Sequence, residues 1–171
     1  MQKIMILGSG GAGKSTSARN LSKITGIKVF YMDKLFWKPG WVSIPRDELK
    51  EKLKSITKLD SWIIDGNYRS TIDVRLKEAD TVIYLDFSTW LCLWGIVKRR
   101  FLYSRKMRPD ITEGCKEKID LEFFMWVLNF RRKNRKEILK MIRNNCEEKS
   151  VYIFKNRREL EKFVGEVNDK L

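Results

Sequence analysis

The chain has 171 residues, of which 43% are hydrophobic and 12% aromatic, which is enough for one compact domain and too much for a disordered chain. It carries 36 lysines and arginines against 22 acidic residues, a net charge of +14, so acidic partners such as nucleotides, nucleic acid or other phosphates are expected. Because the sequence contains no histidine, histidine-based acid–base catalysis, Ser-His-Asp triads and ordinary zinc sites are excluded.

Short apolar runs alternate with helical patterns along the whole chain. This alternation predicts a single three-layer α/β domain over 1–171, in which helices cover both faces of a five-stranded parallel sheet. Strands are expected at 4–7, 28–32, 61–65, 81–86 and 151–154. Helices are expected at 15–24, 45–58, 70–77, 88–103 and 119–145, the last one broken near 129–132, and a final helix begins at Asn156.

Cysteine usage and apolar run length indicate where the protein works. The three cysteines are widely spaced without a Cys-x-x-Cys pair, which predicts reduced thiols in a cytoplasmic protein. The longest apolar runs, at 90–97 and 123–128, are far shorter than the roughly 20 residues of a membrane-spanning helix. We therefore expect no membrane partner and no signal peptide.

The segment between the first strand and the first helix, GSGGAGKS at 8–15, satisfies the pattern G-x-x-x-x-G-K-[ST]. Its glycines let successive backbone N–H groups turn toward phosphate oxygens, and the following helix presents its positive N-terminal end. We expect ATP here, with Lys14 on the β- and γ-phosphates and the Ser15 hydroxyl in the Mg²⁺ shell. The predicted nucleotide-binding residues are Gly8, Ser9, Gly10, Gly11, Ala12, Gly13, Lys14, Ser15 and Thr16. No Asn-Lys-x-Asp string is present to read guanine, so small-molecule kinases are favoured over GTPases.

Three aspartates, Asp33, Asp65 and Asp86, fall at or just past the ends of predicted strands. Ligands of parallel sheets bind at the carboxyl ends of the strands. A carboxylate there can hold Mg²⁺, directly or through water, or accept a proton from an acceptor hydroxyl. Helix capping is the alternative role, above all for Asp86.

Phosphoryl transfer needs cations to stabilise charge, and it does not require histidine. A cationic, polar segment at 104–118 lacks apolar periodicity, so we expect it to be an exposed loop that works as a lid and carries Arg105 and Arg108. Solvated surface charge is the alternative interpretation of these arginines. The full set of candidate arginines is Arg69, Arg99, Arg100, Arg105, Arg108, Arg131, Arg132 and Arg135.

Aromatic residues are concentrated in two places. The segment LFWKPGW at 35–41 either stacks a base or covers the acceptor pocket, or it is a loop pinned by hydrophobic contacts. A second set recurs at helical spacing and is predicted to lie in the core: Trp90, Trp94, Phe123, Phe124 and Trp126.

Several motifs together resemble the DNA topology modulation proteins, a group related to adenylate kinases. They are GSGGAGKST, YMDKLFWKPGW, WIIDGNYRSTIDVRL, DTVIYLDFSTWLCLW with KRR, RPDITEGCKEKIDLEF and NFRR, and they cover almost the whole chain. More distantly, the order of parts resembles adenylate kinases and the nucleoside-monophosphate kinase fold.

This resemblance implies roles for three residues. Asp65 would contact Mg²⁺ through water, Arg69 the acceptor phosphate and Arg99 a nucleotide phosphate. Asn67 and Tyr68 replace the Phe-Pro pair of adenylate kinases, and Gly95 stands where those enzymes place an arginine near the adenine ring.

Two functions follow from the sequence. In the first, the protein is an ATP- and Mg²⁺-dependent kinase of a small nucleotide- or nucleoside-like acceptor. Catalysis would then fall to Lys14, Asp65, Arg99, Arg105 and Arg108, acceptor binding to Asp33 and Arg69, and metal binding to Ser15, Asp65 and Asp86. In the second, it is a nucleotide-dependent DNA-binding factor that influences DNA topology, with the segment 129–143, which has seven basic residues and one acidic, on the phosphate backbone.

Overall fold

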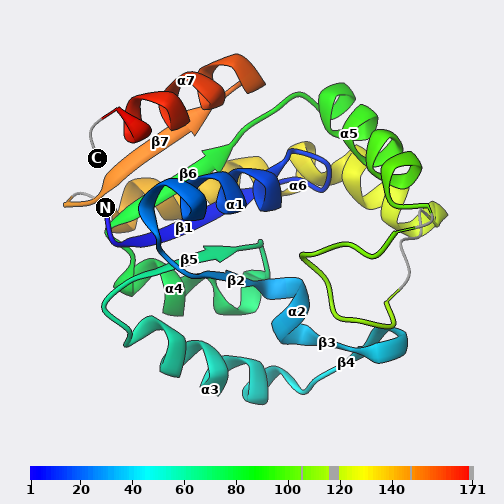
Figure 1. Ribbon diagram of the computed structural model, residues 1–171, viewed down its shortest axis with the longest axis horizontal. Coiled ribbons are helices and arrows are strands. Elements are labelled where there is room, and N and C mark those ends of the chain that lie inside the picture. The colour runs from blue at the N-terminus through cyan, green and yellow to red at the C-terminus, as the bar shows by residue number, and fades with distance from the viewer. Residues whose placement is uncertain (105, 116–119, 147, 170–171) are drawn as a thin grey trace.

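The computed structural model describes residues 1–104, 106–115, 120–146 and 148–169 (Figure 1). At its centre is a parallel five-stranded sheet in the order β2-β5-β1-β6-β7, which confirms the predicted sheet. Its middle strands are buried on both faces, as continuous apolar runs require in a parallel sheet. The strands are β1 (Lys3–Gly8), β2 (Val29–Tyr31), β5 (Trp62–Asp65), β6 (Thr81–Leu85) and β7 (Ser150–Phe154).

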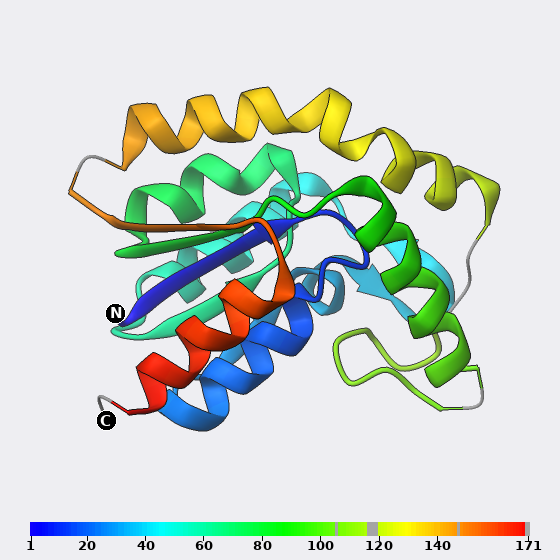
Figure 2. The same cartoon turned by 90° about the horizontal axis from the view of Figure 1, so that it is seen from above.

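Helices cover both faces of the sheet, as Figure 2 shows from above. Helices α1 and α7 pack on one face, and α3, α4 and much of α6 pack on the other. The helices are α1 (Lys14–Thr25), α2 (Met32–Phe36), α3 (Arg46–Thr57), α4 (Ile72–Glu78), α5 (Thr89–Leu102), α6 (Leu121–Asn145) and α7 (Arg157–Asn168). None of the helices within the described residues is long and apolar enough to cross a bilayer.

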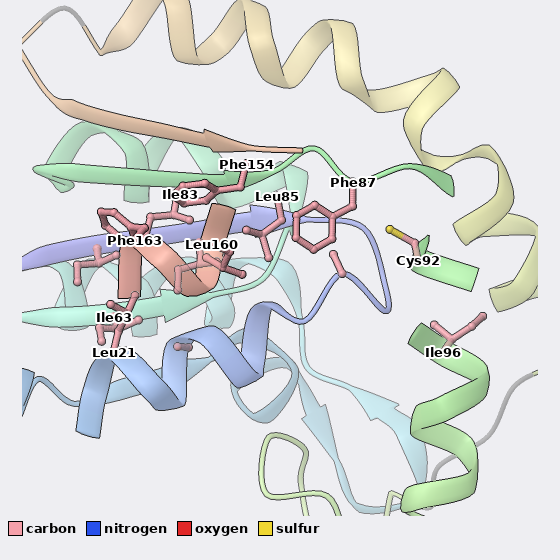
Figure 3. Packing of buried hydrophobic residues seen from close by; sticks show 14 of the residues in the cluster. Leu21, Ile63, Ile83, Leu85, Phe87, Cys92, Ile96, Phe154, Leu160 and Phe163 are labelled. Atoms are coloured by element: carbon pink, nitrogen blue, oxygen red, sulfur yellow. The ribbon is translucent and has the colours of Figure 1, made fainter. Parts of the chain in front are cut away.

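The alternation of side chains along each strand divides the core into two clusters. On one face, Ile4 and Ile6 of β1 belong to the same cluster as Leu21 of α1 and Phe163 of α7. Figure 3 shows how the side chains of this cluster pack between the sheet and these helices. On the other face, Met5 belongs to a second cluster with residues of α3, α4 and α6. All three cysteines are buried and free, in agreement with the predicted reduced thiols.

Helix α6 is continuous over its 25 residues, so the break expected near 129–132 was wrong. Asp120 caps its start, where Oδ1 accepts the Phe123 amide at 2.8 Å. The polar residue Asn129 turns its side chain back onto the Met125 carbonyl at 2.9 Å. The buried positions Val127 and Phe130 continue the apolar stripe across this point, and the helix therefore needs no interruption.

The segment 104–118 was predicted to be an exposed loop; its described part has no helix or strand, as predicted, but it is only partly exposed. Arg108, Asp110, Ile111 and Cys115 are all buried. The Thr112 hydroxyl donates to the Trp37 carbonyl at 2.6 Å, which ties this segment to the aromatic stretch at 35–41. Buried hydrogen bonds to a distant segment have no local signature in the sequence. Arg105 and 116–118 lie outside the described residues.

The aromatic stretch itself forms an unpredicted hairpin of β3 (Trp37–Lys38) and β4 (Val42–Ser43). The rings of Trp37 and Trp41 meet edge to face at 5.5 Å, and Phe36 packs on Trp37 at 4.8 Å. These contacts support the interpretation as a loop pinned by hydrophobic packing.

The aromatic residues of α5 were assigned to the core wrongly. Trp90 is 79% and Trp94 is 62% exposed, while Cys92 and Ile96 of the same helix are buried. Of the α6 aromatics, Trp126 is also exposed, whereas Phe123 and Phe124 pack partly buried against the first cluster. Helical spacing establishes that residues share a face, but the neighbouring elements decide which face is covered.

Candidate active site

The glycine-rich segment 8–15 connects the carboxyl end of β1 to the first residue of α1. The first turn of α1 has no acidic residue, so its unpaired N–H groups and positive dipole face the loop without a competing carboxylate. The Lys14 ammonium donates to the Ser9 carbonyl at 2.9 Å, across the hollow of the loop. A loop of this kind binds phosphate oxygens.

Gly11 of this loop touches the backbone of α5. A Cβ built on Gly95 would lie 2.0 Å from the Gly11 carbonyl oxygen, and one built on Gly11 would lie 2.1 Å from that of Cys92. Only glycine fits at either position, which explains why no arginine stands at position 95. The contact also fixes the next turn of α5, with Lys98 and Arg99, beside the phosphate loop.

A cavity of about 490 Å³ opens beside the loop, within the size range of nucleotide and cofactor pockets. It lies between the start of α1, the second half of α5, the segment at 108–110 and the start of α7. Arg99 lines this cavity, and its guanidinium also lies over the Phe123 ring at 5.5 Å, a cation–π contact. Its charged and polar lining residues include Lys14, Ser15, Thr16, Arg19, Lys98, Arg99, Arg108, Asp110 and Arg157. This excess of cations suits a polyanionic ligand.

Asp65 ends β5 and lies buried next to the loop. Burial raises the pKa of its carboxyl to about 6, although the charge of Lys14 and a hydrogen bond with the Ser15 side chain oppose this shift. Its Oδ1 is buried and has no hydrogen-bond partner among the residues that the structure describes. A buried carboxylate oxygen without a partner is costly unless a ligand completes it.

A second carboxylate, which the sequence analysis did not single out, reaches the same place from the segment 104–118. Asp110 forms a two-bonded ion pair with Arg108, at 3.2 Å from Nε and 2.6 Å from NH2, and both side chains are buried. Burial alone would raise the pKa of Asp110, but Arg108 and a hydrogen bond with Ser15 hold it below its usual value. The sequence held one sign of this ion pair: Arg108 and Asp110 are oppositely charged and only two residues apart.

The residues around Ser15 fit a magnesium ion. Mg²⁺ keeps several of its waters and is held by one or two carboxylates together with substrate phosphates. Ser15 offers a hydroxyl and Asp65 an unpartnered carboxylate oxygen, and Asp110 stands beside them. Within the described ranges no three acidic or thiol side chains form an all-protein cation site.

Asp86 follows β6 and is buried, with its carboxylate bound to two arginines of α6. It accepts Nε of Arg135 at 2.8 Å and of Arg131 at 3.4 Å. The cap of α5 is Ser88, whose side chain accepts the Leu91 amide. Asp86 therefore joins α6 to the carboxyl edge of the sheet.

The two residues predicted to hold the acceptor lie in different surroundings. Asp33, half-buried in α2, accepts a hydrogen bond from the Tyr68 hydroxyl at 2.8 Å. Arg69 is exposed and forms an ion pair with Glu137 of α6. The structure therefore brings Asp33 together with Tyr68, and it turns Arg69 toward α6.

The loop that carries Tyr68 and Arg69 is held by two residues whose role the sequence analysis missed. Asn67 bonds both backbone groups of Gly8, donating to its carbonyl at 2.6 Å and accepting its amide at 3.1 Å. Arg75, fully buried in α4, donates to the carbonyls of Gly66 at 2.6 Å, Asn67, Tyr68 and Thr71. Arg75 shares its helix face with the buried Ile72 and Leu76, and this spacing was a readable signal.

The three comparisons with known proteins concern the fold. No family model matches the chain, and no curated protein matches it either. Among solved structures it is similar to a deoxyadenosine kinase from M. mycoides, with 19% identity over 98% of this chain and 97% of that one and a TM-score of 0.51. It is also similar to a gluconokinase from Sinorhizobium meliloti 1021 (14% identity, 98% and 90% covered, TM-score 0.56). A third is a shikimate kinase from Bacteroides thetaiotaomicron (15% identity, 98% and 96% covered, TM-score 0.50). At these identities the likeness shows the fold, which is that of P-loop kinases.

Proposed function

We propose that this protein is an ATP-dependent kinase that transfers the γ-phosphoryl group to a small nucleotide- or nucleoside-like acceptor. The observation that carries the proposal is that Lys14, Ser15 and Asp110 line one cationic cavity, while the buried carboxylate of Asp65 lies beside Lys14 and Ser15. Phosphoryl transfer depends on positioning and charge stabilisation, and these residue types supply both. The similar solved structures carry the names of kinases for three different acceptors, so they support the reaction and leave the acceptor open.

On the nucleotide side, the loop amides and Lys14 bind the β- and γ-phosphates. To do so, the Lys14 ammonium leaves the Ser9 carbonyl and donates to phosphate oxygens instead. Ser15 and Asp65 would hold Mg²⁺, which when bound would neutralise negative charge on the phosphates. Arg99 and Arg108 line the cavity and stabilise charge on the transferring group. Arg105, which we assign to the same task, lies outside the described residues.

On the acceptor side, the acceptor hydroxyl oxygen attacks the γ-phosphorus as the bond to the β–γ bridging oxygen breaks, so that ADP leaves. Asp33 accepts the hydroxyl proton, for which it gives up its hydrogen bond with Tyr68. Arg69 binds an anionic group of the acceptor in place of Glu137. Asp86 reaches the metal only if Arg131 and Arg135 release its carboxylate.

The test is ADP release from Mg·ATP with a panel of acceptors: nucleoside monophosphates, nucleosides, small hydroxy acids and supercoiled DNA. We expect one class of small acceptor to stimulate release, and Lys14→Ala to lower kcat at least about 10²-fold. Lys23→Ala, on the exposed last turn of the same helix, is the matched control and should retain activity. Equal turnover by the Lys14→Ala and wild-type proteins would contradict the site assignment.

A second candidate, the nucleotide-dependent DNA-binding factor, is favoured by one observation. Arg132, Lys136, Lys140 and Arg143 are exposed and fall on one side of α6 at helical spacing. If ADP release responds to supercoiled DNA alone, and Lys136→Glu with Lys140→Glu removes a salt-sensitive DNA affinity, this function replaces the kinase. Arg131 and Arg135 are unsuitable for that test because they bind Asp86.

A further inference from the structure

Helix α5 carries a stripe of large apolar side chains on its outer side. Trp90, Trp94 and Phe101 are 79%, 62% and 77% exposed, and Val97 between them is half-buried. At about 100° per residue these four positions lie within about 60° of one another around the helix. Figures 1 and 2 both place α5 at the margin of the molecule. Among the residues that the structure describes, the core contacts of α5 are made by Cys92, Leu93 and Ile96, which lie outside this stripe.

The neighbouring helix α6 has an exposed apolar stripe of its own. The first half of α6 exposes Leu121, Met125 and Leu128 at the same helical spacing, by 77%, 43% and 37%. Helices α5 and α6 pack against each other. The exposed parts of Trp90, Trp94 and Phe101 offer roughly 500 Å² on each copy. Two copies paired through α5 would therefore bury about 1,000 Å², the lower limit for a specific interface.

The spacing of the α5 stripe is symmetric. The intervals from Trp90 to Trp94, to Val97 and to Phe101 are four, three and four residues, so the order is the same read from either end. A two-fold axis brings the same patch of two subunits together, and residue i then contacts residue j while j contacts i. An antiparallel pair of α5 helices would place Trp90 opposite Phe101 of the second copy and Trp94 opposite Val97. We propose that the protein forms a homodimer through this face of α5, with the α6 stripe at the flank.

Charge favours the antiparallel over the parallel arrangement. Lys98, Arg99 and Arg100 all lie in the C-terminal half of α5. A parallel pair would align these cations, whereas the antiparallel pair places the two sets toward opposite ends of the interface. The net charge of +14 on each chain still opposes association. Added salt screens this repulsion, so the dimer should tighten as ionic strength rises.

The direction of this salt response distinguishes dimer formation from the binding of other partners that a basic, aromatic surface could attract. Binding of nucleic acid or of an anionic membrane depends on attraction to the basic residues, and it weakens steeply with salt. The inference does not depend on the proposed kinase activity, since the stripe lies on a different side of α5 from Gly95, which faces the phosphate loop.

The first experiment is sedimentation equilibrium of the wild-type chain at low and high salt. We expect a species of twice the 20.4 kDa chain mass, whose dissociation constant falls as salt is added. Trp94→Glu, at the centre of the stripe, should yield a monomer with unchanged circular dichroism. Leu59→Glu is the matched control, since Leu59 is an exposed leucine (46%) far from α5 in the sequence, and it should remain dimeric.

The second experiment tests the orientation. Trp90→Cys and Phe101→Cys proteins are prepared separately and treated with a short thiol-specific cross-linker, alone and mixed. In the antiparallel dimer, residue 90 of one chain faces residue 101 of the other chain. It lies about 16 Å along the helix axis from residue 90 of that other chain. Only the mixture of the two variants should therefore cross-link efficiently. The native cysteines are buried, and the wild-type protein serves as the blank.

Three results would overturn the proposal. They are a wild-type chain that stays monomeric at all salt concentrations, a Trp94→Glu protein that remains as dimeric as Leu59→Glu, and Trp90→Cys that cross-links with itself as well as in the mixture. Sedimentation of a monomeric chain with vesicles of anionic lipid, abolished by Trp94→Glu, would likewise replace the second copy by a membrane surface.

Discussion

The proposed nucleotide side and the proposed acceptor side of this site are built in different ways. The nucleotide side is one continuous stretch, 8–15, whose backbone groups form the proposed binding surface. The residues that would contact the phosphates are therefore consecutive in the sequence. The acceptor side has no such stretch. Asp33, Tyr68 and Arg69 are placed by a buried arginine, by an amide that bonds Gly8 and by an ion pair to α6. The nucleotide side can therefore be recognised from sequence alone, whereas the acceptor side depends on long-range contacts and can change its specificity while the fold stays the same.

The largest effect is expected at Arg75, on the acceptor side. Arg75→Met leaves the carbonyls of Gly66, Asn67 and Tyr68 without their donor, and we expect the free energy of unfolding to fall by about 3–5 kcal/mol. Chemical denaturation measures this loss. Lys77→Met, on the exposed side of the same helix, should cost less than about 0.5 kcal/mol. Similar losses for both variants would mean that Arg75 does not hold the loop.

Gly95 tests the nucleotide side. The Cβ of Gly95→Ala would overlap the Gly11 carbonyl, so α5 must move away from the loop, and we expect a loss of about 1–3 kcal/mol together with weaker ATP binding. Thermal unfolding with and without ATP measures both effects. Gly165→Ala, in α7 with open space around it, should instead leave stability unchanged or raise it by up to ~1 kcal/mol. If Gly95→Ala behaves like Gly165→Ala, the close packing of α5 on the loop is not required.

The buried charge of Asp65 is expected to lower the free energy of unfolding, although the proposed metal site needs that charge. The pKa of Asp65 is raised to about 6 in the folded chain, so the ionised form destabilises the fold. The penalty is absent below the ordinary aspartate pKa near 4, grows as the pH rises from about 4 to 6, and is complete above that.

Asp65→Asn removes this penalty, and we expect it to raise stability by about 1–2 kcal/mol at pH 7 and by much less at pH 4, while it abolishes Mg·ATP turnover. Urea denaturation at both pH values measures the difference. Asp60→Asn is the control: Asp60 is exposed, so this variant should change the free energy of unfolding very little at either pH. A variant that is less stable than wild type at pH 7 would show that the carboxylate is held favourably.

The smallest effect is expected at Tyr68, whose hydroxyl bonds Asp33. Tyr68→Phe keeps the ring contact with Phe36 and should cost up to about 1 kcal/mol. Because it frees Asp33, it should alter KM for the acceptor more than KM for ATP. Steady-state kinetics with both substrates measure this, and an equal change in the two KM values would argue against a place for Asp33 on the acceptor side.

Much of the architecture was readable from the sequence because it rests on local regularities. Apolar runs bounded by turn residues predicted all five strands of the parallel sheet, and the glycine spacing in GSGGAGKS predicted the loop and the helix that follows it. A phosphate loop is made by the backbone angles of adjacent residues, so its pattern is visible in one segment. The strand ends also pointed to Asp65, which lies beside Lys14 and Ser15, and its metal-binding role stays a prediction.

The tertiary structure decided what local patterns leave open. Side-chain spacing on α5 groups Trp90 with Trp94, but the close contact of Gly95 with Gly11 determines that their face points outward. Asp110 and Asn67 reach the loop from segments far along the chain, and these contacts depend on distances that no single segment encodes. The sequence by itself thus determined the sheet and the phosphate loop. Packing between elements decided which carboxylates surround Ser15, how the acceptor side is held and which aromatic face remains uncovered, because burial and pairing are properties of neighbours in space.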